Sequence, residues 1–263
     1  MKYRIQILML LLAMPLYDIL AAEITPEEKG LQIAKEADVR NTGWKDQQAS
    51  LTMILKNRHG QKSTRAIRSK SLEMENDGDK GLSIFDTPKD VKGTAFLSFT
   101  HAVEPDDQWL YLPALKRVKR ISSNNKSGPF MGSEFAYEDL SSQEVEKFTY
   151  KWIKDENKNG RDTFVVERYP AYKHSGYTKQ IAWVDKEMYQ PVVIEFYDRK
   201  GKLLKTLTYF DYKQYINKFW RASKMEMINH ITNKSTELLW ENYQFDTGLS
   251  DRDFDRNSLK RVR

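Results

Sequence analysis

The residues that could carry catalytic chemistry are few in this chain and widely spaced. The sequence contains none of the motifs that organise a hydrolase nucleophile, a phosphate-binding loop, a zinc-binding helix or a dinucleotide-binding turn. Catalysis needs such groups within hydrogen-bond reach of one another, so the sequence favours a binding protein over an enzyme. The chain has four histidines, which are scattered along it: His59, His101, His174 and His230.

One of these histidines has acidic neighbours. His101 precedes Glu104, Asp106 and Asp107, and this is the one cluster in the sequence whose residue types could hold a metal ion. Acidic residues just before a predicted strand more often form a solvated turn. We therefore expect neither a metal site nor a cofactor.

Residues 107–147 combine aromatic, basic and glycine positions in an order that no ordinary strand or helix requires. Residues 108–112 alternate polar and large apolar side chains, which predicts a strand, and Pro113 ends it because proline has no amide donor. The next predicted strand, residues 116–121, carries cations on both faces. A strand of this kind is an edge that its charges protect from pairing with another chain, or a rim that docks an anionic membrane or partner. The candidate rim residues are Lys116, Arg117, Lys119 and Arg120.

A glycine-hinged loop follows the basic strand. Gly128 and Gly132 flank Pro129, Phe130 and Met131, so two large apolar side chains lie on a loop instead of inside a regular element. Such a loop either tucks into the core or covers an apolar site.

The same segment carries a resemblance to a known family. Residues 109–113 read Trp-Leu-Tyr-Leu-Pro, a basic run follows at 116–120, and residues 128–135 read Gly-Pro-Phe-Met-Gly-Ser-Glu-Phe. In this order they resemble the signature of the outer membrane lipoprotein-sorting family, the LolA-like proteins of Gram-negative bacteria. The resemblance covers nearly the whole mature chain. It implies an incomplete β-barrel whose concave face and helical lid enclose a cavity for acyl chains.

Alternating apolar residues predict strands along most of the chain. An Asx residue followed three places later by glycine recurs at residues 57–60, 157–160 and 198–201, and these turns would join neighbouring strands antiparallel. The expected fold class is therefore mainly β, a strongly curved antiparallel sheet that forms a half-open barrel with a few capping helices. The clearest strand patterns are Leu51/Met53/Leu55, Ala95/Leu97/Phe99, Ile181/Trp183, Val192/Ile194/Phe196 and Leu238/Trp240.

Few helices are expected. Residues 25–28 read Thr-Pro-Glu-Glu, which combines a capping box with proline at the first helical position, and the apolar stripe that follows ends near Gly43. Two further short helices are predicted, one from the capping pair Ser141 and Glu144, and one that starts at Asp251 and uses Phe254 and Leu259 as apolar contacts.

Several predicted strands carry apolar residues on both faces, for example Phe96 beside Leu97 and Val192 beside Val193. One face needs a core, and the other needs a helix, a partner or a ligand. We therefore predict a hydrophobic ligand, namely lipoprotein acyl chains or another lipid, although ordinary core packing is the alternative for any single side chain. The residues expected to line the cavity or its lid are Leu97, Phe99, Trp109, Tyr111, Phe130, Met131, Phe135, Trp183, Met225 and Trp240.

The amino terminus has the three-part layout of a secretory signal peptide. Lys2 and Arg4 precede an apolar stretch, residues 5–17, and the small residues Ala21 and Ala22 follow. We expect residues 1–22 to be removed, although a cut after Ala21 and an uncleaved anchor are alternatives. Residues 23–263 would then form a single LolA-like lipid- or lipoprotein-binding domain in the periplasm. The chain has no cysteine, so it can form no disulfide and carry no lipid-modified cysteine.

The overall charge suits a protein that visits anionic membrane surfaces. The net charge is +6, with 30% charged residues, and the aromatic residues are spaced as strand positions, so nothing indicates nucleic-acid binding. The predicted function is that of a monomeric, non-enzymatic carrier that moves its ligand toward the outer membrane, between an inner-membrane transporter and an outer-membrane acceptor. The alternative is an accessory protein of a hydrophobe-exporting transporter, which binds protein instead of lipid. The missing nucleophile motif disfavours a lipid hydrolase.

Overall fold

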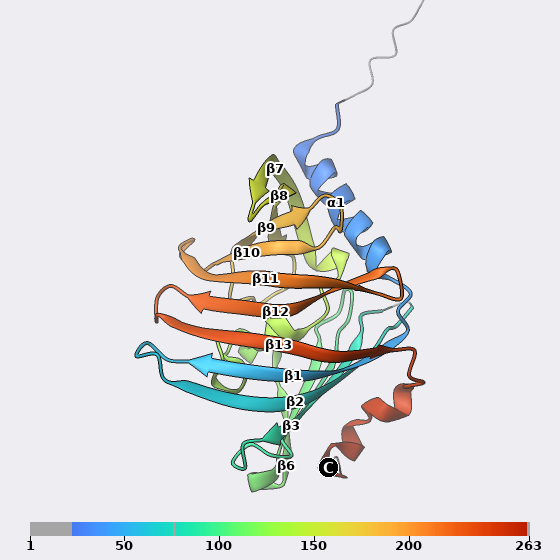
Figure 1. The fold of residues 1–263 in the computed structure, drawn as a ribbon, viewed down its shortest axis with the longest axis vertical. Helices are drawn as coiled ribbons and strands as arrows, with labels where there is room; N and C mark the ends of the chain where they lie inside the picture. The colour runs from blue at the N-terminus through green and yellow to red at the C-terminus, as the bar shows by residue number, and fades with distance from the viewer. Residues whose placement is uncertain (1–22, 76, 262–263) are drawn as a thin grey trace, which may run out of the picture.

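The protein is a single curved antiparallel sheet with one α-helix against it (Figure 1). The computed structural model describes residues 23–75 and 77–261. The expected signal peptide, residues 1–22, lies outside the described residues. The sheet has thirteen strands, and its two edge strands do not pair with each other, so the mainly β class and the half-open barrel predicted from the sequence are confirmed.

The strand order follows the chain except at one place. From one edge to the middle it runs β6 (Arg117–Ile121), β5 (Asp107–Leu112), β4 (Ala95–Phe99), β3 (Lys80–Thr87), β2 (Lys62–Leu72) and β1 (Asp46–Lys56). It continues to the other edge with β13 (Lys234–Phe245), β12 (Phe219–Asn229), β11 (Leu203–Tyr215), β10 (Pro191–Tyr197), β9 (Lys179–Asp185), β8 (Arg161–Pro170) and β7 (Phe148–Lys158). Only the pairing of β1 with β13 joins strands distant in sequence, and it unites the two halves of the sheet.

The predicted turns join the expected strands. Gly60, Gly160 and Gly201 have φ angles of +81°, +80° and +72°, the left-handed region that glycine adopts without a steric cost. The turn between β7 and β8 has two central residues, because Lys158 pairs directly with Arg161, and Asn159 also has a positive φ of 53°. Two central residues with positive φ give a turn whose twist matches that of the flanking strands.

The first predicted helix is confirmed as α1 (Pro26–Asn41). Its capping box is complete: the Glu28 amide donates to the Thr25 hydroxyl at 3.1 Å, and the Thr25 amide donates to the Glu28 carboxylate at 2.8 Å. The helix lies along β7, and a Cβ at Gly30 would come within 2.8 Å of the backbone nitrogens of Lys151 and Trp152. Glycine at this position therefore lets the helix backbone approach the strand directly.

The other two helix predictions have different outcomes. The helix expected from Ser141 and Glu144 is wrong, since this stretch holds only a 3₁₀ turn at Val145–Lys147. Ser141 does not cap it because its hydroxyl donates to Asp106 at 2.8 Å. The helical segment expected near Asp251 is confirmed as two 3₁₀ turns, Asp251–Phe254 and Arg256–Arg261, and both of its predicted apolar contacts, Phe254 and Leu259, are buried.

Alternation along the strands separates two apolar faces. Phe96 and Leu110 belong to the largest core cluster, which we call the inner core, whereas their chain neighbours Leu97 and Trp109 belong to a second cluster on the opposite face. The C-terminal 3₁₀ turns cover this second cluster, which we call the outer cluster. The inner core includes Leu51, Met53, Ile67, Phe85, Ile194, Phe196, Leu207, Met227 and Leu238.

The long connection between the two sheet edges, residues 122–147, packs into the inner core. Phe130 is 2% exposed, and its ring lies 5.1 Å from that of Phe96, 5.9 Å from that of Phe85 and 5.5 Å from that of Tyr137. Of the two alternatives for the glycine-hinged loop, Phe130 thus takes the first and fills the core. Met131 is partly buried against the same cluster.

Polar contacts fix this connection to the middle of the sheet. The Glu134 amide donates to the Thr236 hydroxyl at 3.0 Å, and its carboxylate accepts from the Asn229 side chain at 2.6 Å. Lys205 Nζ donates to the Glu134 carbonyl at 2.7 Å. These bonds satisfy buried groups of three strands, so the connection is an integral part of the barrel interior.

We predict that Gly30→Ala destabilises the docked helix. The added methyl group has no room against the β7 backbone, and overpacking of this kind costs about 1–3 kcal/mol of unfolding free energy. Urea denaturation measures the loss. The exposed helical substitution Gln32→Ala is the control and should change stability by less than about 0.5 kcal/mol. Equal stability of Gly30→Ala and the wild type would contradict the direct approach of α1 to β7.

Candidate functional site

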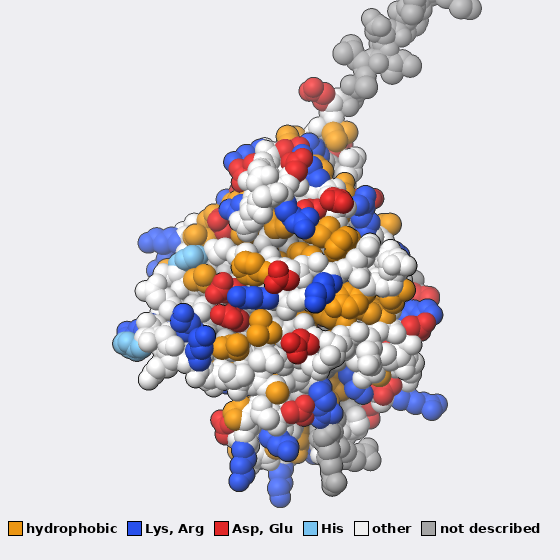
Figure 2. Space-filling model, in the orientation of Figure 1, with side chains coloured by type: hydrophobic (Ala, Val, Ile, Leu, Met, Phe, Trp, Pro, Cys, Tyr) orange, Lys and Arg blue, Asp and Glu red, His pale blue; other side chains and the backbone are white. Residues whose placement is uncertain are grey.

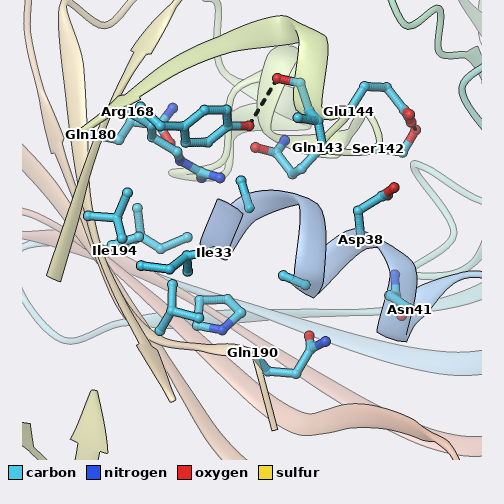
Figure 3. Close-up of a pocket in the computed structure, with 18 of the residues that line it drawn as sticks. Ile33, Asp38, Asn41, Ser142, Gln143, Glu144, Arg168, Gln180, Gln190 and Ile194 are labelled. Atoms are coloured by element: carbon cyan, nitrogen blue, oxygen red, sulfur yellow. Dashed lines mark hydrogen bonds between the residues drawn. The ribbon is translucent and has the colours of Figure 1, made fainter. Parts of the chain in front are cut away.

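A cavity of about 400 Å³ lies between α1, residues 138–145 and the inner face of β7 to β11 (Figure 3). Its size is within the range of small-molecule sites in proteins. The helix covers it as a lid would, and the long connection closes another side. The cavity is thus the part of the barrel interior that the inner core does not fill.

A little over half of the cavity wall is apolar. Ile33, Ala34 and Ala37 contribute from α1, and the short alanine side chains leave space between the helix and the sheet. The sheet and the 138–145 segment provide the remaining apolar lining, which comprises Val145, Val166, Ala182, Val184, Pro191, Ile194, Phe196 and Leu207.

A single arginine lies among these apolar residues. Arg168 is on β8, where its register neighbours Tyr150 and Gln180 also line the cavity. Its Nε donates to the Gln180 side chain at 2.7 Å, and its guanidinium carbon lies 4.8 Å from the centre of the Phe148 ring. Burial lowers the pKa of Arg168, but a guanidinium remains charged at neutral pH. The cavity therefore has a fixed positive charge in its wall.

Carboxyl groups gather at the other side of the cavity. Figure 3 shows Asp38 and Glu144 away from Arg168, toward the C-terminal end of α1. Burial, followed by repulsion from neighbouring carboxylates, raises the pKa of Asp38, and burial is also the main cause of the raised pKa of Glu144. Burial and the charge of Glu144 raise the pKa of Asp79 to about 7. The cavity therefore has a positive charge at Arg168 and a group of carboxyl groups toward the C-terminal end of α1, and Glu138 and Asp139 also line it.

Two tyrosines that line the cavity keep neutral hydroxyls. Burial raises the pKa of Tyr150 to about 12 and that of Tyr209 to about 12, so both are hydrogen-bonding groups and not anions at physiological pH. The Tyr150 hydroxyl donates to the Val145 carbonyl at 3.1 Å.

A second cavity of about 240 Å³ adjoins the first. Asn41, Asp79, Gln190 and Tyr209 line both. Arg221 lines the second cavity, but it is held there by bonds to the side chains of Asn41 at 2.8 Å and Gln47 at 3.1 Å, together with the Trp220 carbonyl at 2.9 Å. The inner face thus offers two adjoining spaces, whose lining extends from β7 to β1.

The ten residues predicted to line a cavity or lid fall into separate places. Leu97, Phe99, Trp109 and Tyr111 lie in or against the outer cluster. Trp183 lies in a small cluster with Val165 and Val193, and its indole donates to Glu156 at 2.5 Å. The other predicted residues lie in or against the inner core, and they are Phe130, Met131, Phe135, Met225 and Trp240. Of all ten predicted residues, only Met225 lines one of the two cavities. Contact of any of the ten with a ligand stays a prediction.

Sequence reasoning missed the residues that do line the larger cavity. Ala34, Ala37 and Arg168 belong to ordinary helix and strand patterns, and their role depends on which face the fold turns inward. One signal was present: Arg168 continues the side of β8 that carries Val166, and a cation on an apolar strand face is uncommon.

The four basic rim residues lie on an edge strand or beside it, as predicted. β6 is the terminal strand of the sheet, and Lys116 precedes it in the hairpin turn. Arg120 pairs with Asp107 at 2.5 Å, whereas Lys116, Arg117 and Lys119 make no ion pair with any residue that the structure describes. Figure 2 shows basic side chains protruding at the lower end of the molecule, where β6 lies in Figure 1.

Two of the three acidic residues near His101, Asp106 and Asp107, have partners within the protein. Asp106 accepts from Lys147 at 2.6 Å, Asp107 pairs with Arg120, and His101 Nδ1 lies 2.5 Å from an Asp77 oxygen. No group of three or more potential ligands suited to a metal ion is found within residues 23–75 and 77–261. In the same residues, no helix has both the length and the apolar character needed to cross a membrane.

We predict that Asp79→Asn flattens the pH dependence of stability. The pKa of Asp79 is about 7 in the folded protein and 3.8 in a model compound, so the folded state keeps a proton that the unfolded chain has released. Stability should therefore fall as pH rises from about 4 to about 7, and the asparagine variant should lack this loss. Urea denaturation at pH 5 and pH 8 tests it, with the exposed Asp211→Asn as control. Equal pH dependence in Asp79→Asn and the wild type would contradict the raised pKa.

Comparisons with known proteins agree with this architecture. A family model described as "Uncharacterized protein" matches residues 77–261, and no curated protein matches the chain. A crystal structure of a domain named for outer membrane lipoprotein sorting, from Vibrio parahaemolyticus, is 62% identical with a TM-score of 0.88, over 89% of this chain and 99% of that chain.

Two further structures are similar over the same extent. A DUF1329 family protein from Desulfovibrio piger is 30% identical with a TM-score of 0.85, and the match covers 90% of this chain and 100% of that chain. A LolA superfamily protein from Nitrosomonas europaea is 19% identical with a TM-score of 0.69, over 89% and 99%, which is a similarity of fold alone. On the strength of the 62% identical relative, this chain belongs to the family of outer membrane lipoprotein-sorting proteins.

Proposed function

We propose that the protein is a non-enzymatic periplasmic carrier that holds acyl chains, from a lipoprotein or another lipid, and moves them toward the outer membrane. The observation that carries this proposal is the apolar cavity between α1 and the inner face of the sheet. The outer membrane lipoprotein-sorting name of the 62% identical relative supports the same class of cargo. Each acyl methylene that leaves water contributes roughly 0.8 kcal/mol, so a cavity of this kind favours a chain over a small polar solute.

Helix α1 is suited to act as the movable cover of the cavity. Only Gly30 and Ile33 of the helix are buried. Its N-terminal half is otherwise held by Lys29 Nζ, 3.4 Å from the centre of the Trp152 ring, and by the pair of Glu27 with Lys151 at 3.2 Å. At its C-terminal end, Arg221 donates to the Asn41 side chain and Arg40 donates to the Glu187 carbonyl, both at 2.8 Å. An element held by few buried contacts opens at a low free-energy cost compared with unfolding of the sheet. Opening of α1 would admit the acyl chain, and closing would remove it from water.

The basic edge is the proposed contact with an anionic membrane or an acidic partner. Lys116, Arg117 and Lys119 have no acidic partner among the described residues, and Leu115, at the tip of the same hairpin, is 64% exposed. Unpaired cations beside an exposed apolar side chain can bind a membrane surface by charge attraction together with shallow insertion. This contact would bring the carrier to the donor or acceptor of its cargo.

Export follows from the same proposal. The signal-peptide layout of residues 1–22 supports cleavage that leaves Glu23 as the first residue of the mature protein, two residues before the cap of α1. The mature domain would then fold in the periplasm.

We predict that Ala37→Trp weakens binding of a fluorescent acyl-chain probe by about tenfold or more, because the indole would displace at least two methylenes worth roughly 0.8 kcal/mol each. Val39→Trp is the matched control, since Val39 lies on the same helix and is 65% exposed. Fluorescence titration measures both. Unchanged binding in Ala37→Trp, with a folded protein, would place the acyl chain elsewhere.

A second prediction concerns the basic edge. Lys116→Glu together with Lys119→Glu should leave the melting temperature nearly unchanged and weaken association with anionic vesicles, more strongly at low salt because salt screens the attraction. The matched control is Lys56→Glu with Lys62→Glu, a pair of exposed lysines on the β1–β2 hairpin. Vesicle co-sedimentation measures association. Equal binding by both double variants would leave edge protection as the role of these cations.

A further inference from the structure

We propose that Arg168 is a headgroup site, so that the cavity selects acyl chains that end in an oxyanion such as a carboxylate. The inference rests on the proposed carrier function, because the chain occupies the same cavity. The headgroup site adds two properties to that function: the chemical class of the ligand and the orientation of the ligand in the cavity.

Arg168 has hydrogen-bonding capacity that the protein leaves unused. Its Nε is bonded to Gln180 and one face lies against Phe148, but neither terminal nitrogen has a partner among the described residues. A charged group in an apolar wall carries a large desolvation cost unless an opposite charge compensates it. The two terminal nitrogens form the fork that binds a carboxylate or phosphate through two parallel hydrogen bonds.

The nearby acids are engaged elsewhere. Asp139 accepts from the Ala136 amide at 2.7 Å and from the Tyr177 hydroxyl at 3.0 Å. Glu138 accepts from the Tyr172 hydroxyl at 3.0 Å, the Ser175 hydroxyl at 2.8 Å and the Gly176 amide at 2.8 Å. Neither carboxylate forms an ion pair with Arg168, so its terminal nitrogens remain available to a ligand.

The charge distribution gives the ligand one orientation. Asp38, Asp79 and Glu144 lie at the acidic side, where burial, followed by repulsion from neighbouring carboxylates, raises their pKa values and where a further anion is disfavoured. At the other side, Arg168 attracts the headgroup. The apolar surface of Ile33, Ala37 and Ile194 then receives the chain (Figure 3).

Neutral hydroxyls can complete the headgroup site. Tyr209 lines the same cavity, and its hydroxyl makes no hydrogen bond with a described residue. Because its pKa is raised to about 12, this hydroxyl remains a donor across the physiological range. An oxyanion on Arg168 could therefore take a further bond from the neutral Tyr209 hydroxyl.

The test compares an anionic probe with its neutral counterpart. cis-Parinaric acid and its methyl ester are titrated by fluorescence into the wild type, Arg168→Gln, Arg168→Lys and the exposed control Arg58→Gln. We expect the wild type and Arg58→Gln to prefer the acid by about tenfold, the free-energy difference of one charge-assisted interaction. Arg168→Gln should lose this preference while it binds the ester as the wild type does, and Arg168→Lys should keep part of it.

Competitors then identify the source of the oxyanion. Palmitate, monopalmitoyl phosphatidate, hexadecanol and inorganic phosphate are added to the wild type loaded with cis-parinaric acid. Displacement by palmitate but not by hexadecanol at equal concentration supports a carboxylate at the end of a chain, and stronger displacement by the phosphatidate assigns the headgroup to a phosphate. Displacement by inorganic phosphate alone would overturn the proposal, because the site would then hold a free anion.

The remaining outcomes separate this inference from the carrier function. Equal affinity of the wild type for acid and ester overturns the headgroup site and leaves the carrier function in place, whereas binding of neither probe overturns both. If Arg168→Gln fails to fold, Arg168→Lys decides: a folded protein that retains a preference for the acid supports the site, and one that prefers neither probe overturns it.

Discussion

A wide antiparallel sheet that curves without closing leaves an apolar inner face that some other part of the chain must cover. Here the pairing of β1 with β13 makes thirteen strands continuous, and the curvature turns Leu51, Phe96 and Ile194 toward one interior. The connection between the two edge strands fills much of that interior, with Phe130 at its centre. Helix α1 covers the rest through residues as small as Gly30, Ala34 and Ala37, and the space that remains is the cavity.

The two segments that cover the inner face, residues 122–147 and α1, differ in how firmly they are attached to the sheet. The proposed function requires this difference. The edge-to-edge connection is fixed by buried bonds from Glu134 to three strands, so it behaves as part of the sheet. α1 has only two buried residues, and a few side-chain contacts, among them the bond from Arg221 to Asn41, complete its attachment. A carrier has to enclose its cargo and release it, and a rigid wall opposite a weakly held helix provides for both. In the further inference above, Arg168 in the cavity wall also gives the cavity a preference for an anionic headgroup.

Local patterns in the sequence predicted much of this fold. Period-two alternation located the strands, the Asx-to-glycine spacing located three hairpins, and the capping box located α1, because each of these depends on interactions within a few residues. The capping pair at Ser141 failed because the hydroxyl is taken by Asp106, which is distant in sequence. The alternation also showed correctly that strands have two apolar faces. It could not show that Phe254 and Leu259 would cover the face of Leu97 and Trp109, nor that Arg168 and the alanines of α1 would meet across a cavity, since both depend on tertiary packing.

Native mass spectrometry of the protein purified from the periplasm, without detergent or added lipid, tests the central claim most directly. If the cavity between α1 and the sheet holds an acyl chain, a fraction of the protein should carry an additional mass that matches an acyl-chain molecule. Collisional activation should release this molecule as an anion if Arg168 binds its headgroup. Protein that carries no such mass, and from which organic solvent extracts no acyl-chain molecule, would contradict the carrier account.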